Sequence, residues 1–90
     1  MTATTDLFDT LTETFELYGY EVDAEIVTEV TNELRFVLAA IISGTELTHD
    51  HYTAIEKSSA HVGYALDEEE IEAYSSVVEV ALFELAKGYA

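Results

Sequence analysis

Three histidines, His49, His51 and His61, are the side chains of this sequence best suited to chemistry. The chain has no cysteine, so imidazole and carboxylate groups are its candidate ligands for a transition metal. Histidine pairs that bind metal from one helix stand three or four residues apart, whereas His49 and His51 stand two apart and point in different directions. We therefore expect surface or helix-capping histidines and no bound cofactor. The alternative is a weak metal or small-ligand site that uses these three residues.

A dense run of carboxylates follows, formed by Asp67, Glu68, Glu69 and Glu70. Calcium-binding loops of the EF-hand type alternate their acidic residues with other residues and place a glycine at the sharp turn. The run here is continuous and has no such glycine. We expect it to cap a helix and to form a solvated face, since acidic side chains are favourable in the first turn of a helix.

No arrangement typical of an enzyme can be found. Ser58 and Ser59 lie close to His61, but neither lies in a nucleophile elbow, and no acid is placed to orient the histidine. The two Gly-Tyr pairs, at 19–20 and 63–64, match neither a dinucleotide-binding loop nor a P-loop. The sequence therefore predicts a protein that is not an enzyme.

The charge of the chain is its most unusual property. Among 90 residues, 19 are acidic and only 3 are Lys or Arg, so the formal net charge is −16. Self-repulsion is severe at low salt, because the screening length is about 10 Å at 0.1 M salt and about 3 Å at 1 M. This composition resembles that of proteins from extreme halophiles. The alternative is an acidic surface that binds a basic protein by mimicking nucleic acid.

The sequence also bears on binding to nucleic acid, on contact with a membrane and on the location of the protein in the cell. Direct binding of DNA or RNA is not expected, because phosphate contacts need clustered Lys or Arg. The N-terminal residues show neither a basic segment nor the apolar stretch of a secretion signal. The longest apolar run, 36–42, is too short to cross a bilayer. We expect a cytoplasmic protein without a membrane partner.

Helical periodicity predicts an all-α chain. Apolar residues recur at helical spacing over about 6–18, 24–43, 49–65 and 68–87, and the sequence contains no proline. Asp23 and Asp67 stand where N-caps belong, whereas Gly19, Gly44 and Gly88 stand where helices end. Thr4 or Thr5 is the expected cap of the first helix.

The two halves of the chain resemble each other. A shift of 44 residues, without gaps, places Gly19 on Gly63, Asp23 on Asp67 and Leu38 on Leu82. The pattern predicts two similar helix–loop–helix halves, 1–44 and 45–88, each with a short and then a long helix. Because an isolated hairpin cannot bury its apolar face, we expect them to form one four-helix bundle domain over 1–90.

Both long helices are apolar on two sides. With Leu34 and Val78 facing the core, further apolar residues lie on the opposite faces, at about 100° of rotation per residue. They are Phe36, Ala39, Ala40, Ala73, Val77, Val80 and Phe83. Exposed apolar patches of this kind usually mark contact surfaces. The alternative is that the short helices cover both sides of the long ones.

These observations predict a small interaction protein with a regulatory or accessory role. Its expected partner is a second copy, in a homodimer, or another protein. The outer faces of the two long helices form the predicted interface. Arg35 and Glu79 are equivalent under the repeat and could form an ion pair if the long helices adjoin.

Overall fold

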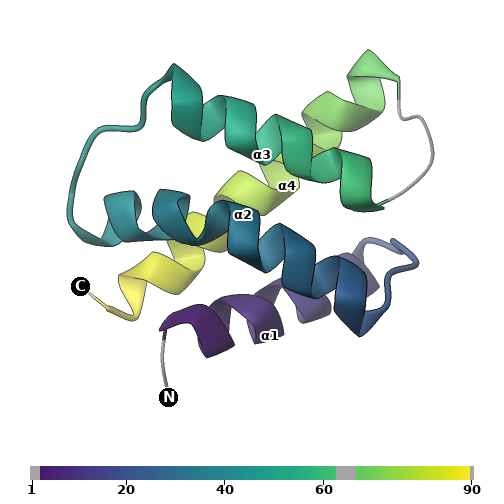
Figure 1. Ribbon diagram of the computed structural model, residues 1–90, viewed down its shortest axis with the longest axis horizontal. Helices are drawn as coiled ribbons and strands as arrows, with labels where there is room; N and C mark the ends of the chain where they lie inside the picture. Colours follow the sequence, from purple (N-terminus) through teal and green to yellow (C-terminus); the bar gives the residue numbers. More distant parts are fainter. Residues whose placement is uncertain (1–2, 63–66, 90) are drawn as a thin grey trace.

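The computed structural model describes residues 3–62 and 67–89, and the side chains from residue 6 onward. Four helices form within these ranges: α1 (Ala3–Leu17), α2 (Ala24–Ile42), α3 (His49–Val62) and α4 (Glu68–Lys87). No strand occurs in the described residues. The predicted all-α fold with two short and two long helices is confirmed (Figure 1).

The predicted caps of the long helices are present. The Asp23 side chain accepts a hydrogen bond from the Ile26 N–H at 2.9 Å. Asp67 accepts from the Glu70 N–H, and the Glu70 carboxylate reaches back to the Asp67 N–H, which completes a capping box. Gly44 has a φ of +75°, which suits glycine and turns the chain sharply after α2.

The first helix begins earlier than its pattern predicts. Because α1 starts at Ala3, Thr4 and Thr5 lie inside the helix, and the expectation that either one caps it is wrong. The third helix ends at Val62 within the described residues, so the predicted extension to residue 65 and the second Gly-Tyr pair lie outside them.

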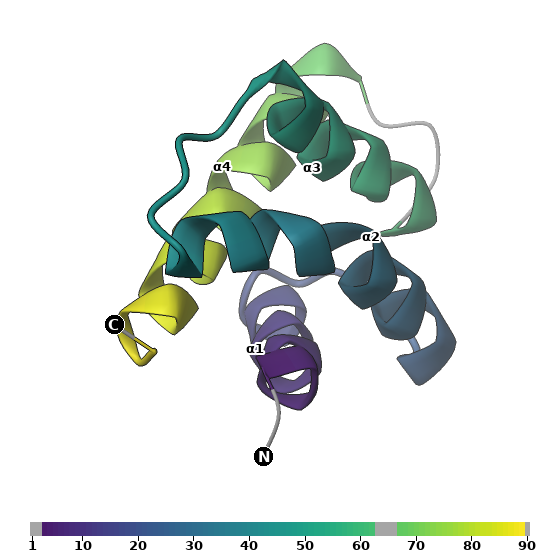
Figure 2. The same ribbon diagram turned by 60° about the vertical axis from the view of Figure 1, so that its left-hand side comes forward.

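The long helices occupy the middle of the bundle, with α4 running obliquely behind α2 (Figures 1 and 2). Each short helix packs against both long helices, whereas α1 and α3 make no contact with each other within the described residues. The core between them is contiguous and apolar. It includes Leu7, Leu11, Phe15, Val27, Val30, Leu34, Val37, Leu38, Ile55, Val62, Tyr74, Val78 and Leu82.

Tyr74 ties three parts of the chain together at the centre of this core. Its ring stacks on Phe15 of α1, with 6.0 Å between ring centroids, and meets Tyr20 of the first linker edge-on at 5.9 Å. Its hydroxyl bonds to Ser58 Oγ of α3 at 2.8 Å, while Ser58 donates to the Ile55 carbonyl. Burial raises the pKa of the Tyr74 hydroxyl, which stays protonated and donates to Ser58.

Candidate functional site

The outer faces of α2 and α4 are not sealed by the described part of the chain. On α2, Phe36 is 48% exposed, Ala39 is exposed and Ala40 is half-buried. On α4, Val80 is 62% and Phe83 42% exposed. Ala73 is also exposed and Val77 half-buried. The short helices therefore leave an apolar surface open on each long helix.

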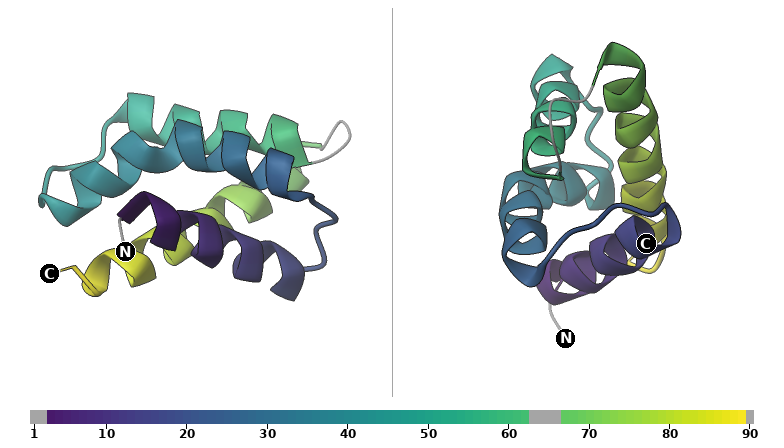
Figure 3. Two further views of the ribbon diagram at one scale, coloured as in Figure 1. Left: turned by 60° about the horizontal axis from the view of Figure 1, so that its bottom comes forward. Right: turned by 90° about the vertical axis from the view of Figure 1, so that its right-hand side faces the viewer.

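The two surfaces lie on opposite sides of the molecule. Figure 3 (right) shows α2 and α4 in two layers, and the core residues Leu34 and Val78 point from these helices into the interior. Side chains on the opposite faces of the helices therefore point outward in opposite directions. The seven predicted interface residues therefore do not form one patch. Phe36 and Ala39 line a surface on α2, Ala40 is half-buried beside it, and the other four lie on α4: Ala73, Val77, Val80 and Phe83.

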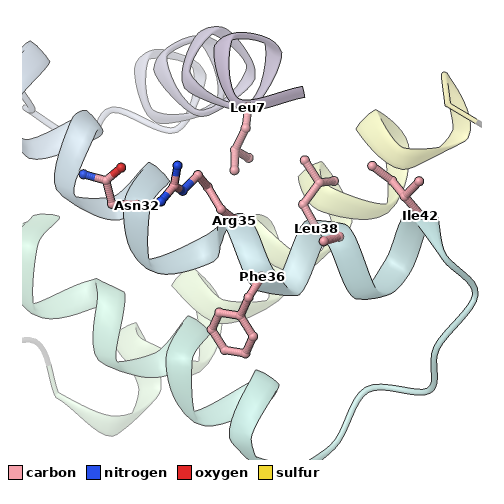
Figure 4. A pocket seen from close by; sticks show the side chains of 7 residues that line it. Leu7, Asn32, Arg35, Phe36, Leu38 and Ile42 are labelled. Carbon is pink, nitrogen blue, oxygen red and sulfur yellow. The ribbon is translucent and has the colours of Figure 1, made fainter. Parts of the chain in front are cut away.

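The first surface, which we call the α2 groove, is a hollow of about 610 Å³ between α1 and α2. Leu7 forms its α1 side, a contribution that the pattern of α2 alone could not reveal. The groove has a polar end at Asn32 and Arg35, and its apolar end is formed by Leu38 and Ile42 (Figure 4). Phe36 and Ala39 complete the lining.

Arg35 has no acidic partner among the described residues. The expected ion pair between Arg35 and Glu79 is therefore not found within one chain. This arginine is one of only three Lys or Arg residues in the protein, and it lies beside an open apolar groove. Its guanidinium group remains available to a carboxylate from outside.

The second surface, which we call the α4 patch, consists of Ala73, Val77, Val80 and Phe83. Glutamates flank its most exposed part, because Glu79 and Glu84 line a shallow hollow together with Val80 and Phe83. Glu84 is already paired with Lys87 of the same helix at 3.0 Å. Glu79 has no basic partner among the described residues, so the α4 patch has an unpaired negative charge at its edge.

A third hollow, of about 600 Å³ between α3 and α4, is strongly acidic. Its lining includes four glutamates, and Tyr52 and Ile55 form part of its apolar wall. The glutamates are Glu56, Glu68, Glu72 and Glu79. This is the feature of the structure that most closely matches the expectation of an acidic surface for a basic partner.

The three histidines do not converge on one point. His49 contacts Thr53 at 3.3 Å, whereas His51 caps α3, since its Nδ1 accepts the Thr48 N–H at 2.8 Å. The His51 ring also stacks on Phe36, with 5.2 Å between ring centroids, and so covers part of the outer face of α2. Nowhere in residues 3–62 and 67–89 do three metal-ligating side chains gather around one point.

His61 instead clamps α3 to α2. Its Nδ1 lies 2.9 Å from Glu29 and its Nε2 lies 2.9 Å from Glu33, one turn further along α2. Two carboxylates can both accept from the ring only when both nitrogens are protonated. The hydrogen bond to Glu33 is the largest factor that raises the pKa of His61; the charges of both glutamates raise it further, and partial burial opposes them.

This clamp predicts a dependence of stability on pH. Because the folded pKa lies above the ordinary value of 6.5, the clamp contributes fully below about pH 6.5 and is lost as the pH rises through the folded pKa. We expect His61→Gln to lower the unfolding free energy by only about 1 kcal/mol at pH 6, because His61 and both glutamates are partly exposed. Above pH 8 the loss should be smaller, because the clamp is lost as His61 deprotonates. Denaturant melts of His61→Gln between pH 6 and pH 9, with His49→Gln as control, test this pH dependence. Equal losses at pH 6 and pH 9 would contradict it.

No helix in the described residues is long and apolar enough to cross a membrane. Comparison with protein-family models, with curated proteins and with solved structures finds no match to this chain.

Proposed function

We propose that this chain is a small, non-enzymatic accessory or regulatory protein that acts through protein–protein contact. The α2 groove and the α4 patch form its contact surfaces, and the partner is a second copy or another protein. The observation that supports this most strongly is the exposure of Phe36, Val80 and Phe83 on the outer faces of the long helices. Isolated apolar side chains on a surface need no explanation, but grouped ones usually mark an interface.

The charge suits such contacts in a salt-rich cytoplasm. At molar salt the repulsion between two chains of net charge −16 is strongly screened. Association through apolar surfaces is not weakened by screening, and salts that are excluded from protein surfaces strengthen it. Salt adaptation and self-association are therefore compatible parts of the same proposal.

A duplication of the helical hairpin is also part of the proposal. Several equivalent positions have the same environment: Leu11 and Ile55 are both buried, as are Leu38 and Leu82. Asp23 and Asp67 both cap long helices through their side chains. These matches support a repeat.

The size of the protein in 2 M KCl tests the proposed function. We expect wild-type protein to sediment as a species heavier than one chain at high micromolar concentration. Phe36→Glu or Phe83→Glu should shift it to the one-chain mass, because each places a charge in an apolar contact. Both side chains are about half exposed, so the variants should keep their helical circular dichroism.

A matched control is Ala60→Glu, which adds the same charge at an exposed position of α3 outside both surfaces. It should sediment like the wild type. Two results together would overturn the proposed function. The first is a wild-type protein that stays at the one-chain mass. The second is a pull-down from the native high-salt extract in which the wild type retains no protein that Phe36→Glu fails to retain.

A further inference from the structure

We propose that the α4 patch of one copy docks into the α2 groove of another, so that the chain associates head-to-tail. This inference rests on the proposed function and names the partner as a second copy. The groove and the patch are complementary in size, in charge and in position, and each of these properties can be traced to particular residues.

The groove and the patch differ in side-chain size at positions that the 44-residue shift makes equivalent. Ala39 of α2 corresponds to Phe83 of α4, so a small side chain stands where the other helix has a large one. Ala39 leaves room in the groove, which has a volume of about 610 Å³. Phe83 is 42% exposed and offers a ring to fill that space. If the Phe83 ring of one copy enters the groove of another, where Leu38 and Ile42 form part of the lining, apolar surface is buried on both copies.

The groove and the patch carry opposite charges at Arg35 and Glu79, which are also equivalent under the shift. Arg35 lies at the polar end of the α2 groove, and Glu79 lies beside Val80 and Phe83 at the α4 patch. Neither has a partner of opposite charge among the described residues of its own chain. When the patch of a second copy enters the groove, the two charges can pair across the contact. Such a pair mainly fixes the orientation of docking.

Position determines the kind of assembly. The groove lies on α2 and the patch on α4, and these helices belong to two different layers (Figure 3). Because each surface is on the side of its helix turned away from the core, one pair of chains cannot satisfy both surfaces of both copies. A contact between two different surfaces closes into a ring or continues as a chain. Wild-type protein should therefore pass the two-chain mass as its concentration rises in 2 M KCl, and it should dissociate in 0.1 M KCl, where repulsion is screened less.

Two variants that each block one surface test this directly. Ala39→Glu blocks the groove and Val80→Glu blocks the patch, and both positions are exposed in the single chain. Each variant alone should remain at the one-chain mass in 2 M KCl. An equimolar mixture should give a two-chain complex and nothing larger, because one intact groove meets one intact patch. Ala60→Glu should assemble like the wild type.

Exchanging the charges of Arg35 and Glu79 in the same equimolar mixture tests the orientation in which the patch docks into the groove. Arg35→Glu in the chain with the intact groove should weaken the complex about threefold, as expected for a pair worth less than about 1 kcal/mol. The pair would lie inside the contact, where 2 M KCl screens it less than at an open surface. Glu79→Arg in the chain with the intact patch should have a similar effect, and the two together should restore binding.

The outcomes separate this inference from the proposed function. If the wild type assembles but the mixture stays at the one-chain mass, the contact joins like surfaces, and the head-to-tail inference is wrong while the proposed function stands. If the wild type is a single chain in 2 M KCl at all concentrations, the inference is also wrong. The pull-down then decides whether another protein occupies these surfaces.

Discussion

Replacement of Tyr74 by alanine is expected to lower the free energy of unfolding by about 4 kcal/mol, the usual range for truncating a buried aromatic residue being about 3–5 kcal/mol. Among the described residues, Tyr74 is the largest fully buried side chain, and it contacts Phe15, Tyr20 and Ser58, which belong to three other parts of the chain. Its loss leaves a cavity where these parts meet. Small domains are stable by about 5–15 kcal/mol in total, so the melting temperature should fall by about 20 °C.

Tyr74→Phe provides the matched control. It keeps the ring but removes the hydroxyl, while Ser58 still donates to the Ile55 carbonyl. The expected loss is therefore about 1 kcal/mol or less. Urea melts of both variants in 2 M KCl provide the comparison. Nearly equal losses for alanine and phenylalanine would show that the aromatic cluster does not hold the helices together.

Lowering the salt concentration is expected to have the second large effect. Two like charges about 10 Å apart in water repel by about 0.4 kcal/mol, and a chain with net charge −16 contains many such pairs. We expect the unfolding free energy to fall by about 3 kcal/mol between 1 M and 0.1 M KCl, as the screening length grows from about 3 to about 10 Å.

Sucrose distinguishes screening from exclusion of the cosolute. Sucrose stabilises proteins because it is excluded from their surface, but it screens no charge. At 0.1 M KCl it should therefore recover only part of the stability that 1 M KCl provides. A free energy of unfolding that does not change between 0.1 and 1 M KCl would show that repulsion among the carboxylates has little influence on this fold.

The long helices could be predicted closely because several local signals agree. An apolar stripe runs along each one, an aspartate caps each start, and Gly44 adopts the positive φ that ends the first of them. These signals depend on neighbours in the sequence. They also predicted the outer apolar faces, since exposure opposite the core follows from helical periodicity.

The start of α1 was predicted less well. Thr4 and Thr5 are good N-cap residues, but they also tolerate a place inside the first turn, and α1 begins at Ala3. Contacts between helices could not be predicted from the sequence, for a different reason. The clamp of His61 on Glu29 and Glu33 joins residues about thirty positions apart, and helical spacing does not determine which helices become neighbours.

At the candidate site, too, local features could be predicted from the sequence, whereas contacts between helices could not. Sequence periodicity identified Phe36 and Phe83 as outward-facing, but it could not show that Leu7 of α1 makes the α2 face into a groove. It also suggested an ion pair between Arg35 and Glu79 within one chain. Arg35 lines the hollow between α1 and α2, whereas Glu79 lines the hollow between α3 and α4. The two side chains therefore do not meet, and no such pair forms among the described residues.

We propose that the outer faces of α2 and α4 become covered when chains meet. Nuclear magnetic resonance with a soluble paramagnetic agent measures this most directly, because the agent broadens the signals of solvent-exposed groups. As protein concentration rises in 2 M KCl, Ala39, Val80 and Phe83 should become protected, whereas Ala60 should stay accessible. Unchanged broadening of all four residues, or protection confined to other parts of the surface, would contradict the claim.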